Sequence, residues 1–328
     1  MELLARSGIA AAILAGTLMP AVLPARAQVY PSATVHLVVA YSPGGTGDFI
    51  ARVISDKLAA VLGRSVVVDN RPGASGAIGT QSVVAAAPDG HTLLVGQTSE
   101  VAINQHWIKN ISYDADKDLQ PIALASVVPL ALAVPAKAPY TTVAELLAAL
   151  SSPDRSFTFA SAGTGTPGHF AGEFLKLKSK GKLTHVPYKG AGPALNDLLG
   201  GHVDFYFPGF PAVAPHLKAG TLKILAVSSA KRSAIAPDIP AVGETAGMGD
   251  FDFTLWQGFF APRGTPPDLV KRLNIEINAI LAQPDVKEKM REAGADIIPM
   301  SVDEFAIFVK AESQKYLRII KDTGVTPE

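Results

Sequence analysis

The chain contains two glycine-rich loops, and each stands between a β-like apolar run and the start of a helical pattern. The first loop is Tyr41–Asp48, which follows the apolar run Val35–Ala40. The second is Gly163–His169, which follows Phe157–Ser161. Glycine lets backbone N–H groups approach a ligand closely, and the first N–H groups of a helix lack internal partners, so such a junction favours an anion. Two junctions about 120 residues apart predict two lobes that hold one ligand between them.

Strands and helices alternate along the rest of the chain. Short apolar runs recur at Val66–Val68 and His91–Gly96, with helical patterns between them, and we expect Val66–Val68 to be a buried strand. This alternation is typical of a parallel sheet covered by helices. The tail adds a predicted strand at Phe251–Ala261, a helix at Pro267–Leu281 and a last helix that opens with the capping box Ser301-x-x-Glu304.

The chain is expected to cross between the two lobes twice. A long apolar run from Ile122 to Val134, broken by Pro129, predicts a strand that leaves the first lobe, and Leu222–Val227 predicts the return. A chain of about 300 residues exceeds what one compact core usually holds. We therefore predict an α/β fold in which residues 28–125 and 230–328 form lobe 1 and residues 126–229 form lobe 2. This arrangement is typical of a hinge-bending clamp.

Residues 1–27 have the pattern of a cleaved signal peptide. Arg6 precedes a short apolar stretch, Ile9–Val22, and Ala25-Arg26-Ala27 fits a cleavage site with small residues at both ends. The stretch is short for a membrane span and is interrupted by proline at position 20. The chain has no cysteine, which excludes both a disulfide and a lipid attached to cysteine. We expect a protein that is exported to the periplasm.

Composition and motifs argue against several classes of function. The chain carries 29 basic and 29 acidic residues, so no excess charge favours nucleic acid or an anionic membrane. Its seven histidines form no His-x-His or His-Glu-x-x-His pair, and it has no Gly-x-Ser-x-Gly elbow. Gly163-x-Gly165-x-x-Gly168 matches a dinucleotide fingerprint, but His185, Pro187 and Tyr188 stand where its acidic partner belongs. We expect neither a metal site nor a cofactor.

Polar and aromatic side chains at the two loops are candidates for ligand contact. Asp48 lies in the first turn of its helix, where it could order the loop or receive a ligand ammonium group. His169 holds the matching position in the second loop and is expected to be a neutral donor or a structural cap. Tyr41 and Tyr188 abut the loops, where a phenol offers an apolar wall and a hydrogen bond. Ser161, His169 and Asp48 could also be grouped as a hydrolytic triad, although nothing in their spacing requires one.

Ordered motifs along the chain resemble those of the Bug-type periplasmic receptors, the substrate-binding components of tripartite tricarboxylate transporters. These motifs lie at Val39–Asp48, Asn70–Gly79, Ala87–Leu94, Gly163–His169, Val186–Gly190, Gly200–Asp204 and Trp256–Pro266. The resemblance extends over essentially the whole chain beyond residue 27.

The resemblance implies a two-lobed type II periplasmic binding fold that closes on a small carboxylated solute. It implies that backbone groups and bridging waters hold the carboxylate, and that membrane permease subunits receive the solute. The expected solute is a dicarboxylate, a tricarboxylate or an aromatic carboxylate, bound by a monomer without cofactor or nucleic acid. The candidate ligand-binding residues are Tyr41, Pro43, Gly44, Gly45, Thr46, Asp48, Ser161, Gly163, Thr164, Gly165, Thr166, His169, Tyr188 and Asp204.

One departure from the family's pattern bears on the solute. The family commonly has an aspartate or another polar residue after the Gly-x-Val-Asp motif, whereas here Phe207 is followed by Pro208-Gly209-Phe210-Pro211. The departure weakens the case for an amino-acid ligand and favours an apolar or aromatic carboxylate. Two other functions stay open from sequence: an exported hydrolase with His169 as base, and a solute sensor that feeds a two-component system.

Overall fold

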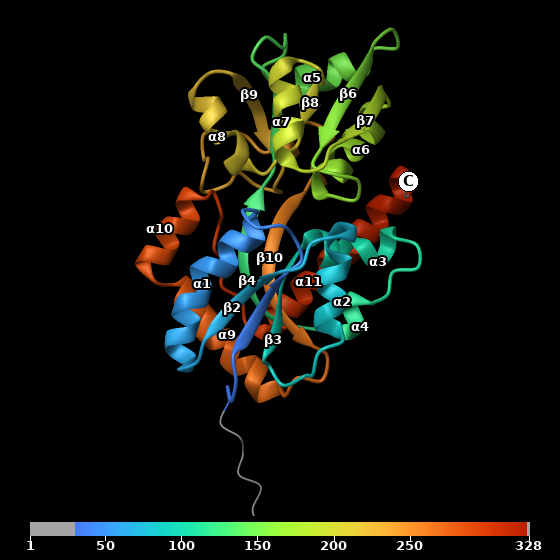
Figure 1. The fold of residues 1–328 in the computed structure, drawn as a ribbon. Coiled ribbons are helices and arrows are strands. Elements are labelled where there is room, and N and C mark those ends of the chain that lie inside the picture. The colour runs from blue at the N-terminus through green and yellow to red at the C-terminus, as the bar shows by residue number, and fades with distance from the viewer. Residues whose placement is uncertain (1–29, 327–328) are drawn as a thin grey trace, which may run out of the picture.

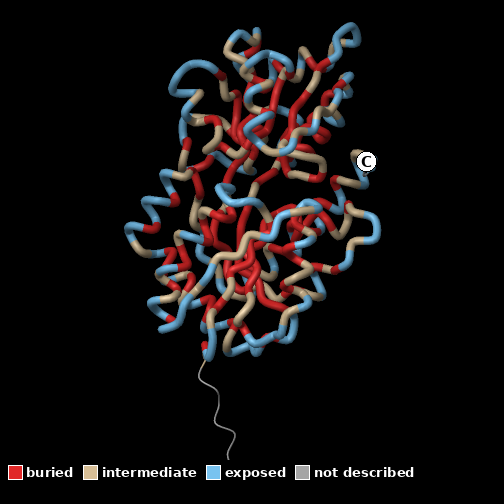
Figure 2. The backbone as a smooth tube through the Cα atoms, in the orientation of Figure 1, coloured by how far each residue is buried: buried red, intermediate tan, exposed pale blue. Residues whose placement is uncertain are grey.

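The computed structural model describes residues 30–326, which form two lobes, each built on a five-stranded sheet (Figure 1). The predicted signal peptide, residues 1–27, lies outside the described residues. Buried residues run along the sheets of both lobes, and the outer turns of the helices are exposed (Figure 2). No helix within residues 30–326 is long and apolar enough to cross a membrane.

The sheet of lobe 1 has the strand order β2-β1-β3-β10-β4. The first three strands are parallel, and β10 is antiparallel to both of its neighbours. One face packs against α1 and α9, and the other against α11 and the segment that follows β3. The strands are β1 (Val35–Val39), β2 (Val66–Asn70), β3 (Thr92–Gln97), β4 (Leu119–Pro129) and β10 (Thr254–Pro262), and the longer helices are α1 (Thr46–Leu62), α2 (Ala77–Val84), α9 (Pro267–Leu281), α10 (Pro284–Glu292) and α11 (Val302–Thr323).

The sheet of lobe 2 has the order β7-β6-β8-β5-β9. β6 is parallel to β7 and β8, whereas β5 is antiparallel to β8 and β9. The strands are β5 (Ala131–Pro135), β6 (Ser156–Ser161), β7 (Lys182–Pro187), β8 (Phe205–Tyr206) and β9 (Leu222–Val227), and the helices are α5 (Val143–Leu150), α6 (Pro167–Ser179), α7 (Ala191–Gly200) and α8 (Phe210–Lys218).

The chain passes between the two sheets at Leu130, which joins β4 to β5, and returns through residues 228–253. Ser228 ties these crossings together: its amide donates to the Leu130 carbonyl at 2.9 Å, and its hydroxyl accepts from the Leu130 amide at 3.0 Å. The Phe253 amide, just before β10, donates to the Ser228 carbonyl at 2.9 Å. Ala236 and Ala241 in the returning segment belong to the core of lobe 2, although the sequence assigned residues from 230 onward to lobe 1.

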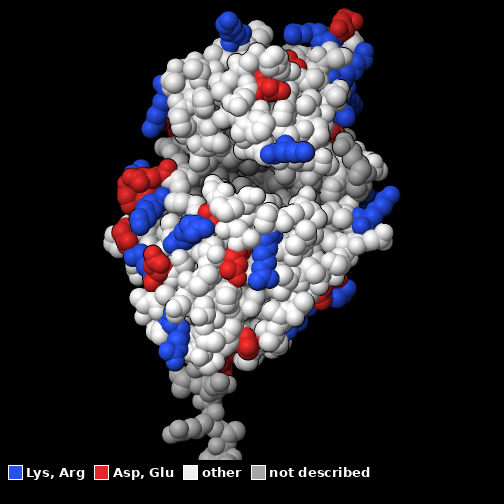
Figure 3. Space-filling view, viewed as in Figure 1, with Lys and Arg blue, Asp and Glu red and all other residues white. Residues whose placement is uncertain are grey.

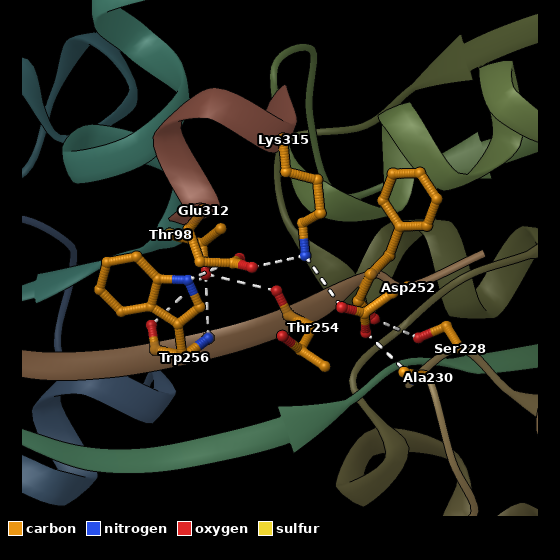
Figure 4. A network of polar contacts seen from close by, with 9 residues as sticks. Thr98, Ser228, Ala230, Asp252, Thr254, Trp256, Glu312 and Lys315 are labelled. Atoms are coloured by element: carbon orange, nitrogen blue, oxygen red, sulfur yellow. Dashed lines mark hydrogen bonds and ion pairs between the residues drawn. The ribbon is translucent and has the colours of Figure 1, made fainter. Parts of the chain in front are cut away.

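A network of polar side chains braces the returning crossing against α11 (Figure 4). Lys315 on α11 contacts the Glu312 carboxylate at 2.6 Å and the Asp252 carboxylate at 3.3 Å. Glu312 also accepts from the indole N–H of Trp256, on β10, at 3.0 Å. Asp252 in turn accepts from the Ala230 amide at 3.0 Å. Helix α11 is therefore connected to both ends of the segment that links β9 to β10.

The structure corrects several predicted elements. β2 is half-exposed and not buried, because it lies at the edge of the sheet and pairs with another strand, β1, on one side only. α1 begins at Thr46, so Thr46–Asp48 belong to the helix instead of the loop. The capping box at Ser301 and Glu304 is confirmed, and α1 ends at a left-handed C-cap, Gly63. Elements without a clear sequence pattern were not predicted: the π-helical turn η2 (Ser99–Ile103), α3 (Asn104–Trp107), α4 (Ala115–Asp118), the short turns η1 (Ala74–Gly76) and η3 (Val242–Glu244), and α10.

Candidate functional site

The first glycine loop leaves the N-terminus of α1 uncovered. Its N-cap, Gly45, has an ordinary extended backbone and no side-chain cap, while Gly44 has φ +86°, which favours glycine. Pro43, Gly44 and Gly45 are exposed, and Thr46 is half-buried. The first N–H groups of a helix have no internal acceptor. The loop therefore offers an open set of backbone donors at the positive end of the helix dipole.

Asp48 is occupied within its own lobe. Its Oδ2 accepts from the Gly44 amide at 2.9 Å and from Arg52 Nε at 3.0 Å, and its Oδ1 lies 3.0 Å from Arg52 Nη2. The hydrogen bonds from Arg52 hold the pKa of the Asp48 carboxyl below its usual range. Of the two roles that the sequence left open, the contacts favour the ordering of the loop over the reception of an ammonium group.

Tyr41 donates its hydroxyl to a buried carboxylate that the sequence analysis missed. The acceptor is Glu100 Oε2, at 2.7 Å, and Oε1 of the same side chain accepts from the Gln97 amide at 2.7 Å. Glu100 lies in the π-helical turn after β3 and is fully buried. A Cβ on Gly76 would lie 3.0 Å from both Tyr41 Oη and Glu100 Cβ. Because of this close approach, the second family motif, Asn70–Gly79, packs directly on the base of the first loop.

The second glycine loop has strained backbone that only glycine adopts readily. Gly163 has φ +147° and Gly165 has φ +77°. Thr166, the N-cap of α6, accepts from the His169 amide at 3.4 Å and donates its hydroxyl to the Gly163 carbonyl at 2.7 Å. Thr164 is half-buried. Pro167, the first residue of α6, has no N–H, and the His169 amide is capped by Thr166, so the Gly168 amide is the one first-turn donor left for a ligand.

Ser161, His185 and His169 lie together beneath this loop. Ser161 Oγ donates its hydrogen to the Gly163 carbonyl at 2.9 Å and also lies 2.7 Å from His185 Nε2. Because the hydroxyl has only one hydrogen, His185 Nε2 is the donor in the second contact. The His169 ring stacks on His185 at 4.0 Å, and its Nδ1 accepts from the Gly165 amide at 3.2 Å. Burial lowers the pKa of His169 to about 3 and that of His185 to about 4. Both rings are therefore neutral at physiological pH.

These contacts do not form a hydrolytic triad. The hydroxyl of Ser161 is bonded to His185 and not to His169, and Asp48 is paired with Arg52 in the other lobe. A nucleophile needs a base within hydrogen-bond reach and a third group that orients the base. Within residues 30–326 no group of three or more histidine, aspartate and glutamate side chains is arranged to hold a metal ion.

Tyr188 and Asp204 differ in their relation to the loops. The Tyr188 amide donates to the Ser161 carbonyl at 3.0 Å, and its hydroxyl donates to Asp197, so Tyr188 lies beside the second loop. Asp204 instead accepts from the Thr158 amide at 2.7 Å and from the Thr158 hydroxyl at 3.1 Å. Thr158 lies three residues before Ser161 on β6, or about 10 Å along the strand. The structure therefore does not bring Asp204 to the glycine loops.

The apolar residues after β8 line the core and not the space between the lobes. Phe207 and Phe210 are almost fully buried, at 2% and 7% exposure. A Cβ on Gly168 would lie 2.5 Å from the Phe207 carbonyl oxygen, so the start of α6 packs tightly on this segment. The expectation that this sequence departure favours an apolar or aromatic solute therefore loses its support.

The surface is hollowed between the two lobes (Figure 3), and α1 and α6, which follow the two glycine loops, begin on the sides of the lobes that face each other (Figure 1). β1 and β6 each end just before these loops, and parallel sheets bind ligands beyond the carboxyl ends of their strands. A cavity of about 370 Å³ lies elsewhere, between α10 and residues 234–235, and contains no residue of either loop.

Comparison with known proteins identifies the family. The model of the tripartite tricarboxylate transporter family receptor matches residues 50–325. The chain belongs to this family. The family comprises periplasmic solute-binding receptors and not enzymes, which sets aside the hydrolase alternative.

Relatives of this receptor are similar over nearly their full lengths. A UPF0065 protein from the tcbD-tcbE intergenic region of Pseudomonas sp. (strain P51) is 37% identical, over 90% of this chain and 88% of its own. Protein BugT of Bordetella pertussis is 34% identical, over 92% of both chains. The resemblance to the Bug-type receptors is thereby confirmed.

Solved structures confirm the fold class. R. palustris Rpa4515 with adipate has a TM-score of 0.81 and 34% identity, and covers 91% of this chain and 100% of its own. MatC from Rhodopseudomonas palustris with bound malate has a TM-score of 0.77 and 32% identity, with 89% and 100% coverage. The periplasmic binding protein BugD has a TM-score of 0.78 and 32% identity, with 91% and 100% coverage. The receptor therefore has the two-lobed α/β fold of these binding proteins.

Glu100 gives this receptor a specific dependence of stability on pH. Burial raises the pKa of Glu100 to about 7, so the folded state retains this proton at a pH where the unfolded chain has lost it. Stability is accordingly lost as the pH rises from about 4.5 to about 7, by ~3 kcal/mol. A Glu100→Gln variant, which resembles the protonated acid, is expected to gain about this much relative to the unmodified protein at pH 8 and almost nothing at pH 4.5.

Urea unfolding of both proteins from pH 4.5 to pH 8 measures this difference. The difference between the two proteins isolates Glu100, because His169 and His185 act in the opposite direction and are common to both. Their pKa values are lowered, so they cost stability as the pH falls below about 6.5. A stability difference that does not change with pH would show that Glu100 does not titrate in this range.

Proposed function

We propose that this receptor captures a small carboxylated solute between Gly44–Asp48 and Gly163–His169 and delivers it to the permease subunits of a tripartite transporter. The observation that supports the proposal is that each lobe has a helix that begins directly after a glycine-rich loop, α1 uncapped and α6 partly capped, while the surface between the lobes is hollowed (Figure 3). Backbone donors suit a carboxylate, and no lysine or arginine has to enter the site. The receptor acts as a periplasmic monomer in this proposal, with the N-terminal segment directing its export.

Structural relatives support a carboxylate as the solute. Rpa4515 was solved with adipate and MatC with malate, and both are more than 30% identical to this chain. Two or three hydrogen bonds to a charged group contribute about 1.5–3 kcal/mol each. Together with apolar contact they can offset the ordering costs and approach the ~8 kcal/mol of micromolar affinity. Closure of the lobes excludes bulk water and makes both sets of donors available together.

Isothermal titration calorimetry over a panel of carboxylates tests the proposal. The panel contains succinate, malate, adipate, citrate, benzoate, and their amino-acid counterparts aspartate and 2-aminoadipate. We expect at least one carboxylate to bind with micromolar or better affinity and to be recovered unchanged. If no carboxylate binds, the proposed function is wrong.

A further inference from the structure

Trp107 of lobe 1 lies directly against the second glycine loop of lobe 2. A Cβ on Gly165 would lie 3.0 Å from both Cδ1 and Nε1 of the Trp107 indole. The indole also meets Phe170 edge-on, with ring centroids 5.2 Å apart, and His169 at 5.7 Å. Trp107 ends the short helix α3 and is 5% exposed. It is therefore the lobe 1 side chain that limits the space beside Gly165.

The adjacent ring of His169 carries its hydrogen on Nε2. His169 Nδ1 accepts from the Gly165 amide, so in the neutral ring the hydrogen resides on Nε2. Stacking on His185 and burial to 3% exposure fix the ring in place. The bond to Gly165 thus makes His169 a donor toward any group that approaches Nε2.

Both donors lack an acceptor among residues 30–326. No hydrogen bond is made by Trp107 Nε1 or by His169 Nε2, and neither belongs to the fully enclosed polar atoms, so water or a solute can reach them. The other tryptophan provides a contrast, because its indole N–H donates to Glu312. An N–H group that is largely buried without an acceptor is unfavourable. The two donors are therefore suited to an oxygen supplied by the solute.

The carboxylates around the loops are all engaged by other groups. Asp48 is held by Arg52, Glu100 by Tyr41 and Asp197 by Tyr188. A solute ammonium group would need such an acceptor and would otherwise be desolvated without a partner. Within residues 30–326 these carboxylates already have hydrogen-bond partners, whereas Trp107 Nε1 and His169 Nε2 have none.

We propose that Trp107 Nε1 and His169 Nε2 donate together to a solute oxygen, and that the receptor selects dicarboxylates without an amino group over the matching amino acids. The pair spans the two lobes, so it forms the complete contact only when they are close. The inference rests on the proposed capture of a carboxylate and adds to it the chemical class of the solute. Trp107 acts here as a specificity-determining residue that no glycine-loop motif contains.

Calorimetry with matched solute pairs tests the inference. The pairs are succinate with aspartate and adipate with 2-aminoadipate. The unmodified receptor is expected to bind the amine-free member of at least one pair ten-fold or more tightly. Trp107→Phe keeps an aromatic ring against Phe170 but removes the donor, and is expected to weaken dicarboxylate binding about ten- to hundred-fold. Ile307→Ala, a change at an exposed position on α11, is expected to leave that affinity unchanged.

Fluorescence gives a second readout that depends on contact and not on affinity. In Trp256→Phe the only tryptophan is Trp107, so addition of a bound dicarboxylate should shift its emission. The melting temperature of each variant shows whether a loss of affinity reflects the missing hydrogen-bond donor or a destabilised fold. Equal affinity of Trp107→Phe and the unmodified receptor, or equal binding of the two members in both solute pairs, would overturn the inference and leave carboxylate capture intact. Failure of every carboxylate to bind the unmodified receptor would overturn both.

Discussion

Replacement of Gly45 by leucine is expected to weaken solute binding by at least a hundred-fold while the protein remains folded. Gly45 has φ −79° and ψ 172°, a conformation open to any residue, and a Cβ there would meet only the Ser42 carbonyl oxygen, at 3.7 Å. The backbone therefore accepts the substitution without strain. A leucine side chain would instead cover the open donors at the start of α1, which a carboxylate must reach to within about 3 Å.

Calorimetry and thermal melting of the Gly45→Leu variant measure the two halves of this prediction. Gly249→Leu is the matched control, because Gly249 is exposed in a turn, has no positive φ and would place a Cβ with no neighbouring atom within 4 Å. We expect the control to bind and melt like the unmodified protein. Unchanged affinity in Gly45→Leu would show that the first loop does not contact the solute, and a large drop in melting temperature would show that its backbone is less tolerant than its angles indicate.

The two glycine loops could be found from sequence because their signal is local. Each follows an apolar strand and precedes an amphipathic helix, and the structure has β1 before α1 and β6 before α6 in the same order. The crossing at Leu130 was marked in advance by a proline within a long apolar run. The prediction of two lobes came from these features together with the resemblance to the family.

Other parts of the site depend on contacts between distant residues, which composition and spacing do not reveal. Glu100 belongs to no motif, and its partner Tyr41 lies 59 positions earlier in the chain. The only feature of the sequence that could have indicated a buried carboxylate is that Glu100 directly precedes the apolar stretch Val101–Ile103. Trp107 is similar, because the helix that carries it has four residues and no amphipathic period. Asp204 was a candidate only because it belongs to the motif Gly200–Asp204. In the structure its carboxylate accepts from the Thr158 amide, which connects that motif to β6.

Lys315→Met is expected to destabilise the receptor by about 3 kcal/mol at pH 7, by leaving a buried carboxylate without its cation. Lys315 reaches both Glu312, at 2.6 Å, and Asp252, at 3.3 Å (Figure 4). Glu312 is 6% exposed, and burial already raises its pKa although Lys315 opposes the rise. Methionine fills a similar volume, so the loss reports the charge and not a cavity.

The pH dependence of this loss identifies its cause. Without Lys315 the pKa of Glu312 rises further, so the folded state binds its proton at a higher pH than the unfolded chain does. Stability then falls as the pH rises, and the defect of the Lys315→Met variant should be larger at pH 8 than at pH 5. Urea unfolding at the two pH values gives this comparison. Lys310→Met, an exposed position on the same helix, is the control and should change stability by less than about 0.5 kcal/mol.

Loss of Lys315 is also expected to reach the clamp through the returning crossing. Asp252 accepts from Ala230 as well as from Lys315, so its position is shared between α11 and the segment that leaves β9. With the ion pair removed, that segment is held by fewer contacts, and the relative orientation of the two lobes becomes less restricted. A hinge that samples more orientations lowers the fraction of molecules ready to close, and apparent affinity falls by that fraction. Weaker carboxylate binding by Lys315→Met, with no change for Lys310→Met, would be the expected calorimetric result. Equal affinity of the two variants would limit the role of Lys315 to stability.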